Sequence, residues 1–122
     1  MATKEKHVEK ADRNAAFAKA LRLDNPVNID WAFTALFYSG LHYIDAYFEK
    51  VGLAPHLHDT HGKRDKMMVL DSTLKPIRNE YFDLKNFGRA ARYECGPLKA
   101  SEVTDDAIPA LEAIRTHIQK VL

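Results

Sequence analysis

The chain has 122 residues, 46% of them hydrophobic, so it has the size of one domain and enough apolar side chains to form a core. Its 18 Lys and Arg against 17 Asp and Glu give a net charge of +1 and a pI near 7.9, which excludes the strongly basic class of nucleic-acid-binding domains and leaves only a local basic face. The lone Cys95 excludes an internal disulfide and fits a reducing compartment.

The beginning of the chain and its most apolar stretch carry no targeting signal or membrane anchor. The first ten residues combine charges of both signs without an apolar run, unlike a secretory signal or a transit peptide. The most apolar stretch, residues 31–44, is too short to cross a bilayer, which takes about 20 apolar residues. We therefore expect a single cytoplasmic domain over residues 1–122, with no membrane association.

The first predicted helix covers about residues 4–23. Its apolar positions are spaced by three and four and share one face: Val8, Ala11, Ala15, Ala18 and Leu21. Charged side chains fill the opposite side. The run Asp24-Asn25-Pro26 ends the helix, because the residue before a proline is pushed out of the helical region.

The second predicted helix begins at Asn28 as N-cap, and Gly52 follows it as a left-handed C-cap residue. One stripe of it is apolar throughout: Ile29, Phe33, Leu36, Phe37, Gly40, Ile44, Tyr47, Phe48 and Val51. Further apolar residues cover much of the remaining circumference: Trp31, Ala32, Ala35, Tyr38 and Leu41. A helix that is apolar nearly all round is buried nearly all round. Either it lies at the centre of a bundle, or its second face packs against another protomer.

Three more helices are predicted after the loop of residues 53–58. A short helix runs from Asp59 or Thr60 to Leu70, and Asp71-Ser72-Thr73 then caps a fourth helix that carries Pro76 in its first turn and ends near Tyr93. The last helix begins at Thr104 or Asp105, so that Pro109 is no breaker. No segment alternates as a strand does. The sequence therefore predicts an all-α, up-and-down bundle of four main helices plus one short helix.

The inner faces of these last helices follow from the same spacing. Inward positions on the fourth helix are Ile77, Tyr81, Leu84, Gly88 and Ala91. Inward positions on the last helix are Ile108, Leu111, Ile114, Ile118 and Val121. Gly88 weakens its helix but allows a neighbouring helix to approach closely.

Ser39, His42 and Asp45 form the first group of candidate functional residues. Their spacing of three places them on one face of the second helix. A serine, a histidine and an aspartate suggest nucleophilic catalysis, but side chains on one helix stand side by side and seldom converge on one reacting atom. We favour a buried polar stripe, with His42 paired to Asp45 or to a partner on another helix, and keep His42 and Asp45 as catalytic candidates.

A second group is the loop with His56, His58 and His61, close to Asp59. Three imidazoles and a carboxylate within six positions could hold zinc or another borderline metal ion. None of the standard metal motifs has this spacing, however, and solvated loop histidines are common. These three histidines are therefore metal candidates, and we favour solvated loop side chains.

The third group is a basic ridge at the end of the fourth helix, formed by Lys85, Arg89 and Arg92 with Tyr93 beside them. The spacing of four and three aligns the cations, guanidinium groups suit phosphate, and a tyrosine ring can stack on a base. The acidic neighbours in the same helix make an ordinary solvated face an equal alternative. Phosphate-loop, Cys-x-x-Cys and Gly-x-Ser-x-Gly motifs are missing, so the sequence implies no cofactor.

The order of these features resembles the HEPN family (higher eukaryotes and prokaryotes nucleotide-binding), over about residues 29–122. The resemblance starts with the aromatic-rich helix, whose sequence is IDWAFTALFYSGLHYIDAYF over residues 29–48. It continues through Gly52, the stretch from His58 and His61 to Arg64, the run YFDL over residues 81–84, and RAARY over residues 89–93. The resemblance implies a helical bundle, usually homodimeric, which would also account for a second apolar face.

The HEPN resemblance implies one of two activities. Many members are ribonucleases of toxin–antitoxin and defence systems, and others are accessory modules that bind nucleotides or RNA. The nuclease members carry an arginine followed four to six residues later by histidine. Here Arg89 and Arg92 lie in the right region, but the next histidine is His117, and Arg78 has none at the required distance either. The metal-independent mechanism, which needs that histidine to move a proton, is therefore not carried over.

Three functions follow from these observations. The first is a non-catalytic, HEPN-like dimeric module that binds RNA, a nucleotide or a partner protein through Lys85, Arg89, Arg92 and Tyr93. The second is a divergent ribonuclease that uses Arg89 and Arg92 and substitutes His42 for the missing histidine, with or without a metal ion held by His56, His58 and His61. The third is a purely structural interaction protein. We favour the first.

Overall fold

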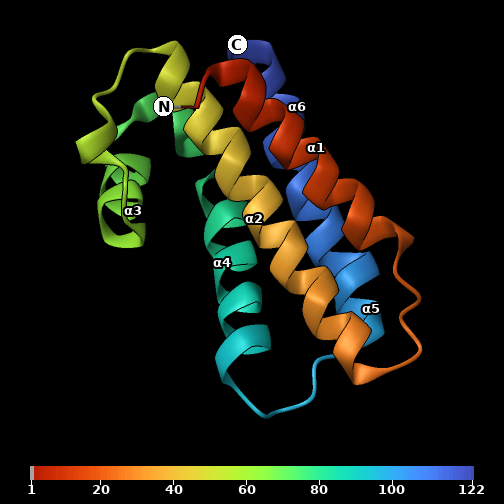
Figure 1. The fold of residues 1–122 in the computed structure, drawn as a ribbon. Coiled ribbons are helices and arrows are strands. Elements are labelled where there is room, and N and C mark those ends of the chain that lie inside the picture. The colour runs from red at the N-terminus through yellow and green to blue at the C-terminus, as the bar shows by residue number, and fades with distance from the viewer. Residues whose placement is uncertain (1) are drawn as a thin grey trace.

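The computed structural model describes residues 2–122, which form helices and no strand (Figure 1). The helical elements in chain order are α1 (Lys4–Ala20), α2 (Pro26–Lys50), η1 (Pro55–Leu57), α3 (His61–Leu70), η2 (Ser72–Ile77), α4 (Arg78–Tyr93), α5 (Ala100–Glu102), η3 (Val103–Ala107) and α6 (Ile108–Val121). The 3₁₀ turn η2 runs directly into α4, and α5, η3 and α6 are one continuous helix. The predicted all-α bundle is confirmed. Within residues 2–122, no helix combines the length and apolarity needed to cross a bilayer.

The four long helices alternate in direction, as predicted for an up-and-down bundle. Figure 1 shows α1 running one way, α2 returning between its neighbours, α4 running parallel to α1, and α6 returning parallel to α2. The short helix α3 lies to one side, next to α4 and the second half of α2. Helix α3 is attached to the bundle through the fully buried Met68 and through polar side chains, which are described below.

Helix α2 is apolar on nearly all sides because it lies at the centre of the bundle. Its second apolar face is covered by other helices of the same chain and not by another protomer. It packs against α1, α4 and α6, and most of its residues are buried. The chain therefore covers both apolar faces of α2 by itself. Two apolar residues of the predicted helix are exceptions: Trp31 is 56% exposed, and Val51, assigned to the inner stripe, is 53% exposed because it follows the last helical turn as the C-cap. Gly52 has φ +73°, the left-handed conformation expected after a helix.

The predicted start of α2 at Asn28 is wrong by one turn. Asn25 is the N-cap, and its Oδ1 accepts a hydrogen bond of 2.9 Å from the backbone N–H of Asn28. Pro26 is then the first helical residue, a position where its missing N–H costs nothing. The Asn28 side chain instead donates to the carbonyl oxygen of Arg22, at 2.8 Å. The sequence predicts that Pro26 ends the first helix, whereas in the structure Pro26 begins α2.

The predicted starts of the last two helices also need correction. Asp71 caps the 3₁₀ turn η2, which contains Pro76, so Pro76 precedes α4. The final helix begins at Ala100 and not at residue 104 or 105. It reaches Pro109 through the π turn η3, whose backbone bond joins Ile108 N–H to the Val103 carbonyl. A π turn is wider than an α turn, and it precedes the point where proline would interrupt the regular hydrogen bonding.

Helices α2 and α4 approach closely at Gly88. A Cβ atom added to Gly88 would lie 2.8 Å from the Cβ of Phe37, a separation that real side chains do not show. Only glycine fits there, which agrees with the predicted role of Gly88. The close approach places Phe37 directly beneath the C-terminal turns of α4, where the basic ridge lies.

Candidate functional site

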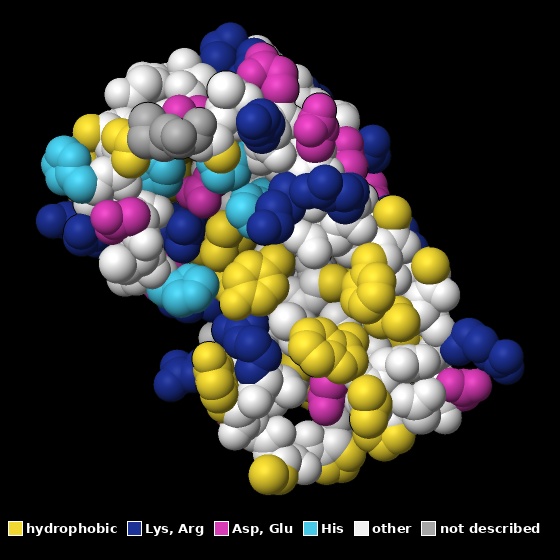
Figure 2. Space-filling model, viewed as in Figure 1, with side chains coloured by type: hydrophobic (Ala, Val, Ile, Leu, Met, Phe, Trp, Pro, Cys, Tyr) yellow, Lys and Arg dark blue, Asp and Glu magenta, His cyan; other side chains and the backbone are white. Residues whose placement is uncertain are grey.

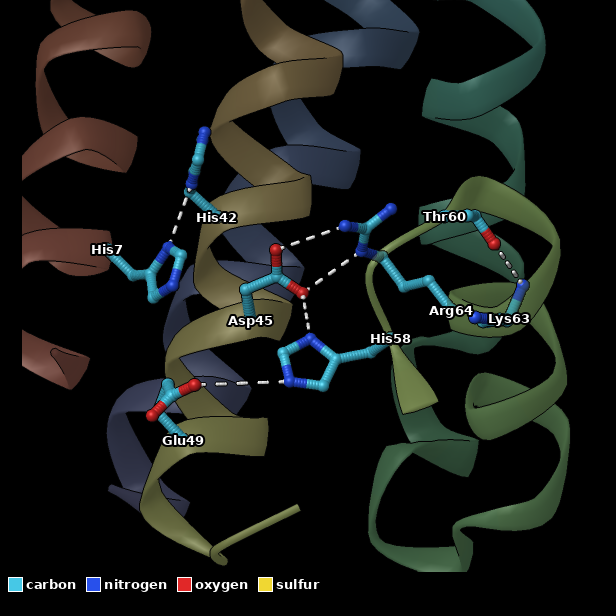
Figure 3. Close-up of polar contacts among 8 residues, drawn as sticks. All are labelled: His7, His42, Asp45, Glu49, His58, Thr60, Lys63 and Arg64. Carbon is cyan, nitrogen blue, oxygen red and sulfur yellow. Dashed lines mark hydrogen bonds and ion pairs between the residues drawn. The ribbon is translucent and has the colours of Figure 1, made fainter. Parts of the chain in front are cut away.

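A buried carboxylate on α2 joins this helix to α3. Asp45 is 5% exposed, and its two oxygens accept hydrogen bonds from Arg64 Nε at 3.0 Å and Arg64 Nη2 at 3.2 Å (Figure 3). Thr60 places the arginine, because it caps α3 one turn earlier. Burial lowers the pKa of Arg64, but the hydrogen bonds and charge of Asp45 outweigh burial and raise it. The guanidinium therefore stays charged and forms a bidentate ion pair.

His58 completes the surroundings of this carboxylate. Its Nδ1 lies 3.1 Å from Asp45 Oδ1, and its side chain is only 7% exposed. The other ring nitrogen, Nε2, is buried without a hydrogen-bond partner among the described residues, and Glu49 Oε1 is 4.0 Å away. Three elements thus converge on one aspartate: α2, the loop after η1, and α3.

On the other side of Asp45, two histidines face each other across α1 and α2. His7 Nδ1 and His42 Nδ1 are 3.0 Å apart, and the rings are stacked with centroids 5.3 Å apart (Figure 3). Burial lowers the pKa of His42 to about 4, with a smaller contribution from His7. Burial also lowers the pKa of His7. Both rings are therefore neutral at pH 7, and one Nδ1–H donates to the other Nδ1.

The predicted Ser39, His42 and Asp45 group is the polar stripe that we favoured. Ser39 is fully buried, and its hydroxyl donates to the Ala11 carbonyl at 2.7 Å. His42 pairs with His7 on another helix, whereas Asp45 pairs with α3 and the preceding loop. None of the three forms a hydrogen bond to another member of the group. They act as three separate attachments of α2 to its neighbours.

The three loop histidines do not form a common site. His56 is exposed on η1, His58 is buried against Asp45, and His61 is exposed at the start of α3, with its ring 5.8 Å from that of Phe37. Among residues 2–122, the group of potential metal ligands that does converge is His7, His42 and Asp45. The structure does not bring the candidate ligands His56, His58 and His61 together, and His58 is buried rather than solvated.

The predicted ligand-binding residues line one pocket, here called the arginine–tyrosine pocket. It has a volume of about 200 Å³, and its lining consists of Phe37, Tyr38, His61, Lys85, Arg89, Arg92 and Tyr93. All four predicted residues of α4 are present. Two residues of α2 form its aromatic floor, and α3 contributes a histidine. The pocket is thus built by three helices and not by the basic ridge alone.

The guanidinium of Arg92 is the central group of this pocket. It lies 5.3 Å from the ring centroid of Phe37, 5.4 Å from that of Tyr38 and 5.3 Å from that of Tyr93. Its Nε and Nη1 atoms are buried and have no hydrogen-bond partner in the described part of the chain. Aromatic faces stabilise the charge but accept no N–H bond of ordinary strength. Two donors of Arg92 are therefore left without an acceptor among residues 2–122.

The other cations around the pocket differ in how far their charges are neutralised. Lys85 bonds to the carboxylate of Asp65 on α3. Arg89 is exposed, and no described carboxylate pairs with it. Burial lowers the pKa of His61, and the charges of Arg64, Lys85 and Arg92 lower it further. The pocket therefore has a positive potential, although the molecule as a whole carries a net charge of only +1.

Three histidines bear on the ribonuclease hypothesis. His42 does not line the arginine–tyrosine pocket, whereas His61 does. His117, the histidine that follows the arginines in the sequence, lies elsewhere and is 2.6 Å from the Thr73 carbonyl. Sequence reasoning considered the histidines that follow Arg89 and Arg92 along the chain, and His42 as a substitute, and it missed His61 as a neighbour of the arginines because the contact between α3 and α4 does not follow from spacing.

A larger hollow lies between α4 and the final helix. It has a volume of about 710 Å³ and contains none of the predicted site residues. Its charged lining residues are all acidic: Glu80, Asp83, Asp105 and Asp106. Such a surface repels phosphate. We therefore place the candidate site in the smaller basic pocket, where unpaired donors and aromatic rings lie together.

No protein-family model, curated protein or solved structure matches this chain. The HEPN resemblance accordingly remains a prediction from the residue pattern. The function is argued below from the geometry of the described residues.

Proposed function

We propose that this chain is a non-catalytic, HEPN-like module that binds single-stranded RNA, with one nucleotide held in the arginine–tyrosine pocket. The observation that carries the proposal is the state of Arg92. Its guanidinium lies among three aromatic rings and keeps two buried N–H donors without a partner. A buried, unsatisfied donor costs about 1–3 kcal/mol, so an acceptor that binds there relieves this penalty.

Phosphate is the acceptor that best fits these donors. An arginine fork binds phosphate through paired, charge-assisted hydrogen bonds. Arg89 lies one turn before Arg92 in the same lining and supplies a second unpaired fork. Carboxylate ligands have similar geometry, but they would not use the aromatic groups of the pocket. A ligand that combines phosphate with a flat ring uses both.

The aromatic groups and the small volume favour a strand of RNA over a free nucleotide. Tyr93 is 75% exposed and Tyr38 lies on the floor, so a base can stack at the rim of the pocket. Enclosed small-molecule sites usually have volumes of roughly 300–1,000 Å³, and this pocket has about 200 Å³. It therefore accommodates one phosphate or base, while the adjoining nucleotides lie outside. Unpaired RNA offers bases that are free to stack in this way.

The test is fluorescence anisotropy with a labelled single-stranded RNA in the presence of chelator. Arg89→Ala/Arg92→Ala should weaken binding by at least about tenfold, because both phosphate contacts are lost. It should also flatten the dependence of log K on log salt by about 1.4, since each neutralised phosphate contributes about 0.7 for single strands. Unlabelled ATP serves as competitor to distinguish a free nucleotide from an RNA strand.

The matched control is Arg13→Ala/Lys66→Ala. It removes the same two charges from exposed positions on α1 and α3, outside the pocket. Its affinity for RNA should stay within about twofold of the original chain. An equal loss in both double variants would show that binding depends on net charge alone. Unchanged affinity in the arginine variant would refute the site.

A divergent ribonuclease is the second candidate, and the position of His61 favours it over the version with His42. His61 lies in the pocket lining beside the arginines and has a lowered pKa, so its ring is neutral and able to accept a proton at pH 7. The RNA from the binding reactions is therefore also run on a denaturing gel. Cleavage in chelator that is lost in His61→Gln and retained in His42→Gln supports this candidate. Intact RNA supports the non-catalytic module.

We further propose that the module is a homodimer. The support is an exposed apolar surface that adjoins the pocket: Trp31 is 56% exposed and Val27 62% exposed, and both line a hollow that includes Arg92. Figure 2 shows hydrophobic side chains gathered over the C-terminal half of α1 and the N-terminal half of α2. A second copy placed here would bring the two pockets towards one interface.

Light scattering at micromolar concentration tests the dimer. The original chain should have the mass of a dimer, and Trp31→Lys should have that of a monomer, because a charge at the centre of an apolar interface is left without a partner. The control is Leu70→Lys on α3, which is 65% exposed and lies outside this surface. It should remain dimeric. A monomeric original chain would contradict the proposal.

A further inference from the structure

We infer that His7, His42 and Asp45 form a binding site for a divalent transition-metal ion of the zinc type. This site lies apart from the arginine–tyrosine pocket, and none of its residues lines that pocket. Two imidazole nitrogens and one carboxylate oxygen are a donor set that zinc and similar ions favour. The proposal is independent of the function proposed above, and either can fail without the other.

The positions of the ligand atoms fit a chelate. One ligand atom from each of the three residues lies within 4.8 Å of the others. The two Nδ1 atoms are 3.0 Å apart. Zinc binds imidazole nitrogen at about 2.0–2.1 Å, so two nitrogens on a tetrahedral ion are about 3.3 Å apart. The rings need to separate by only a few tenths of an ångström to admit the ion. The Asp45 carboxylate lies on the third side, and its oxygen, which is within 4.8 Å of the nitrogens, has to approach the ion by up to about 1.5 Å.

The protonation state of the histidines also suits a metal ion. A metal ion binds neutral imidazole, so a protonated ring must first lose its proton. The 3.0 Å contact between His7 Nδ1 and His42 Nδ1 already requires that one of these two nitrogens carries no proton, because only an unprotonated ring nitrogen accepts a hydrogen bond. When the ion replaces the Nδ1–H···Nδ1 hydrogen bond, the proton of that bond moves to Nε2 of its ring, which is free to hold it.

The surroundings of Asp45 hold its carboxylate in place. Arg64 and His58 contact Asp45 on the side away from His7 and His42 (Figure 3). Hydrogen bonds to a ligating carboxylate orient it, and a carboxylate with three such bonds keeps a lone pair for an ion. The neighbouring Glu49 adds a second negative charge that offsets Arg64. The positive guanidinium therefore does not exclude a cation from the opposite side.

The site would be open at one position. His7 and His42 are only half-buried, so water or a small ligand can reach an ion that they hold. Three protein ligands with an open fourth position are typical of zinc sites that bind or activate a ligand, whereas structural sites use four. Because His7 lies on α1 and the other two ligands on α2, an ion would also join these helices.

The experiment uses the full chain after removal of metal ions by chelator. Titration with Zn²⁺ in a calorimeter should give one ion per chain, and Co²⁺ should give the d–d absorption of a four- or five-coordinate site. Saturating Zn²⁺ should raise Tm by about 5–10 °C, because only the folded chain has the preformed site. No saturable one-to-one binding by either ion would overturn the inference.

Three single variants identify the ligands. His7→Gln removes a ligand near the start of α1 without opening the core, and it should weaken Zn²⁺ binding at least tenfold while the far-ultraviolet circular dichroism stays unchanged. His42→Gln should weaken it similarly. His56→Gln, an exposed histidine outside the site, is the control and should bind as the original chain does. Binding that survives His7→Gln and is lost in His56→Gln would place the ion in the loop and refute this site.

Discussion

Asp45→Asn is expected to lower the free energy of unfolding by about 3–5 kcal/mol, the largest polar effect in the molecule. The substitution keeps the shape of the side chain but removes the negative charge opposite Arg64, whose side chain is 9% exposed. Breaking a buried ion pair by removing one partner leaves an uncompensated charge, and this accounts for the size of the loss. His58 loses its carboxylate partner in the same step. Urea denaturation followed by circular dichroism measures the change.

Two further variants separate the buried charge from other effects of the substitution. Adding Arg64→Met to Asp45→Asn should restore part of the lost stability, since it removes the orphaned charge and keeps an apolar side chain of similar length. Asp59→Asn breaks the exposed pair with Lys63, whose side chain is 51% exposed, and should leave the denaturation midpoint almost unchanged, because solvent screens an exposed pair. A loss below about 1 kcal/mol for Asp45→Asn would mean that Arg64 turns to solvent.

The fold was largely predictable because the apolar spacing of each long helix is regular. The faces assigned to α1, α4 and α6 are those that the structure buries, as Ala11, Leu84 and Ile114 illustrate. The position of α2 was predictable for the same reason, since a helix that is apolar on nearly all sides has to be surrounded. Periodicity gives the face of a helix directly, and in an up-and-down bundle the faces define most of the packing.

The helix ends were less predictable because a proline can either follow the end of one helix or occupy the first turn of the next. The sequence predicts that Pro26 ends the first helix and that Pro109 lies in or near the first turn of the last helix. Pro26 is instead the first residue of α2, and Pro109 lies inside a continuous helix that begins at Ala100. The π turn before Pro109 has no sequence signature that periodicity could detect. The backbone conformation at a proline depends on where the neighbouring helices require the chain to go.

For the candidate sites, too, the sequence predicted the residues that share one helix but not the contacts between helices. Lys85, Arg89 and Arg92 share one helix, so their common face followed from spacing alone. The contacts between helices did not: neither the pairing of His7 with His42 nor the Arg64–Asp45 pair follows from spacing along the chain. One signal was present for the first of these pairs. His7 precedes the buried Ala11 by one turn, which puts an imidazole on the inner face of α1.

Phe37 is the residue at which the core and the candidate site meet. It is fully buried, and its ring lies 6.1 Å from that of Tyr81, a core residue on α4. The same ring lies beneath the guanidinium of Arg92 and borders the arginine–tyrosine pocket. Gly88 allows α4 to approach this side chain. Substitutions at Phe37 should therefore change both stability and RNA binding. The loss of stability depends on the volume of the new side chain, and the loss of RNA binding depends on whether it is aromatic.

Phe37→Ala is expected to lower the free energy of unfolding by about 3–5 kcal/mol, because it removes a buried ring and leaves a cavity between α2 and α4. Phe37→Leu retains most of the volume and should lower stability by less than about 1.5 kcal/mol. It nevertheless removes the aromatic face under Arg92, which contributes about 0.5–2 kcal/mol when the cation is desolvated. Denaturant unfolding and RNA anisotropy on the same two variants check these expectations.

The leucine variant gives the sharper test, because it separates packing from recognition. If Phe37 fixes the guanidinium of Arg92 for a phosphate, Phe37→Leu should weaken RNA binding several-fold while the chain stays folded. If the side chain serves only the core, RNA affinity should follow stability, and the leucine variant should bind as well as the original chain. That second outcome, together with an effect of Arg92→Ala, would leave Arg92 as a ligand but remove the aromatic floor from the recognition mechanism.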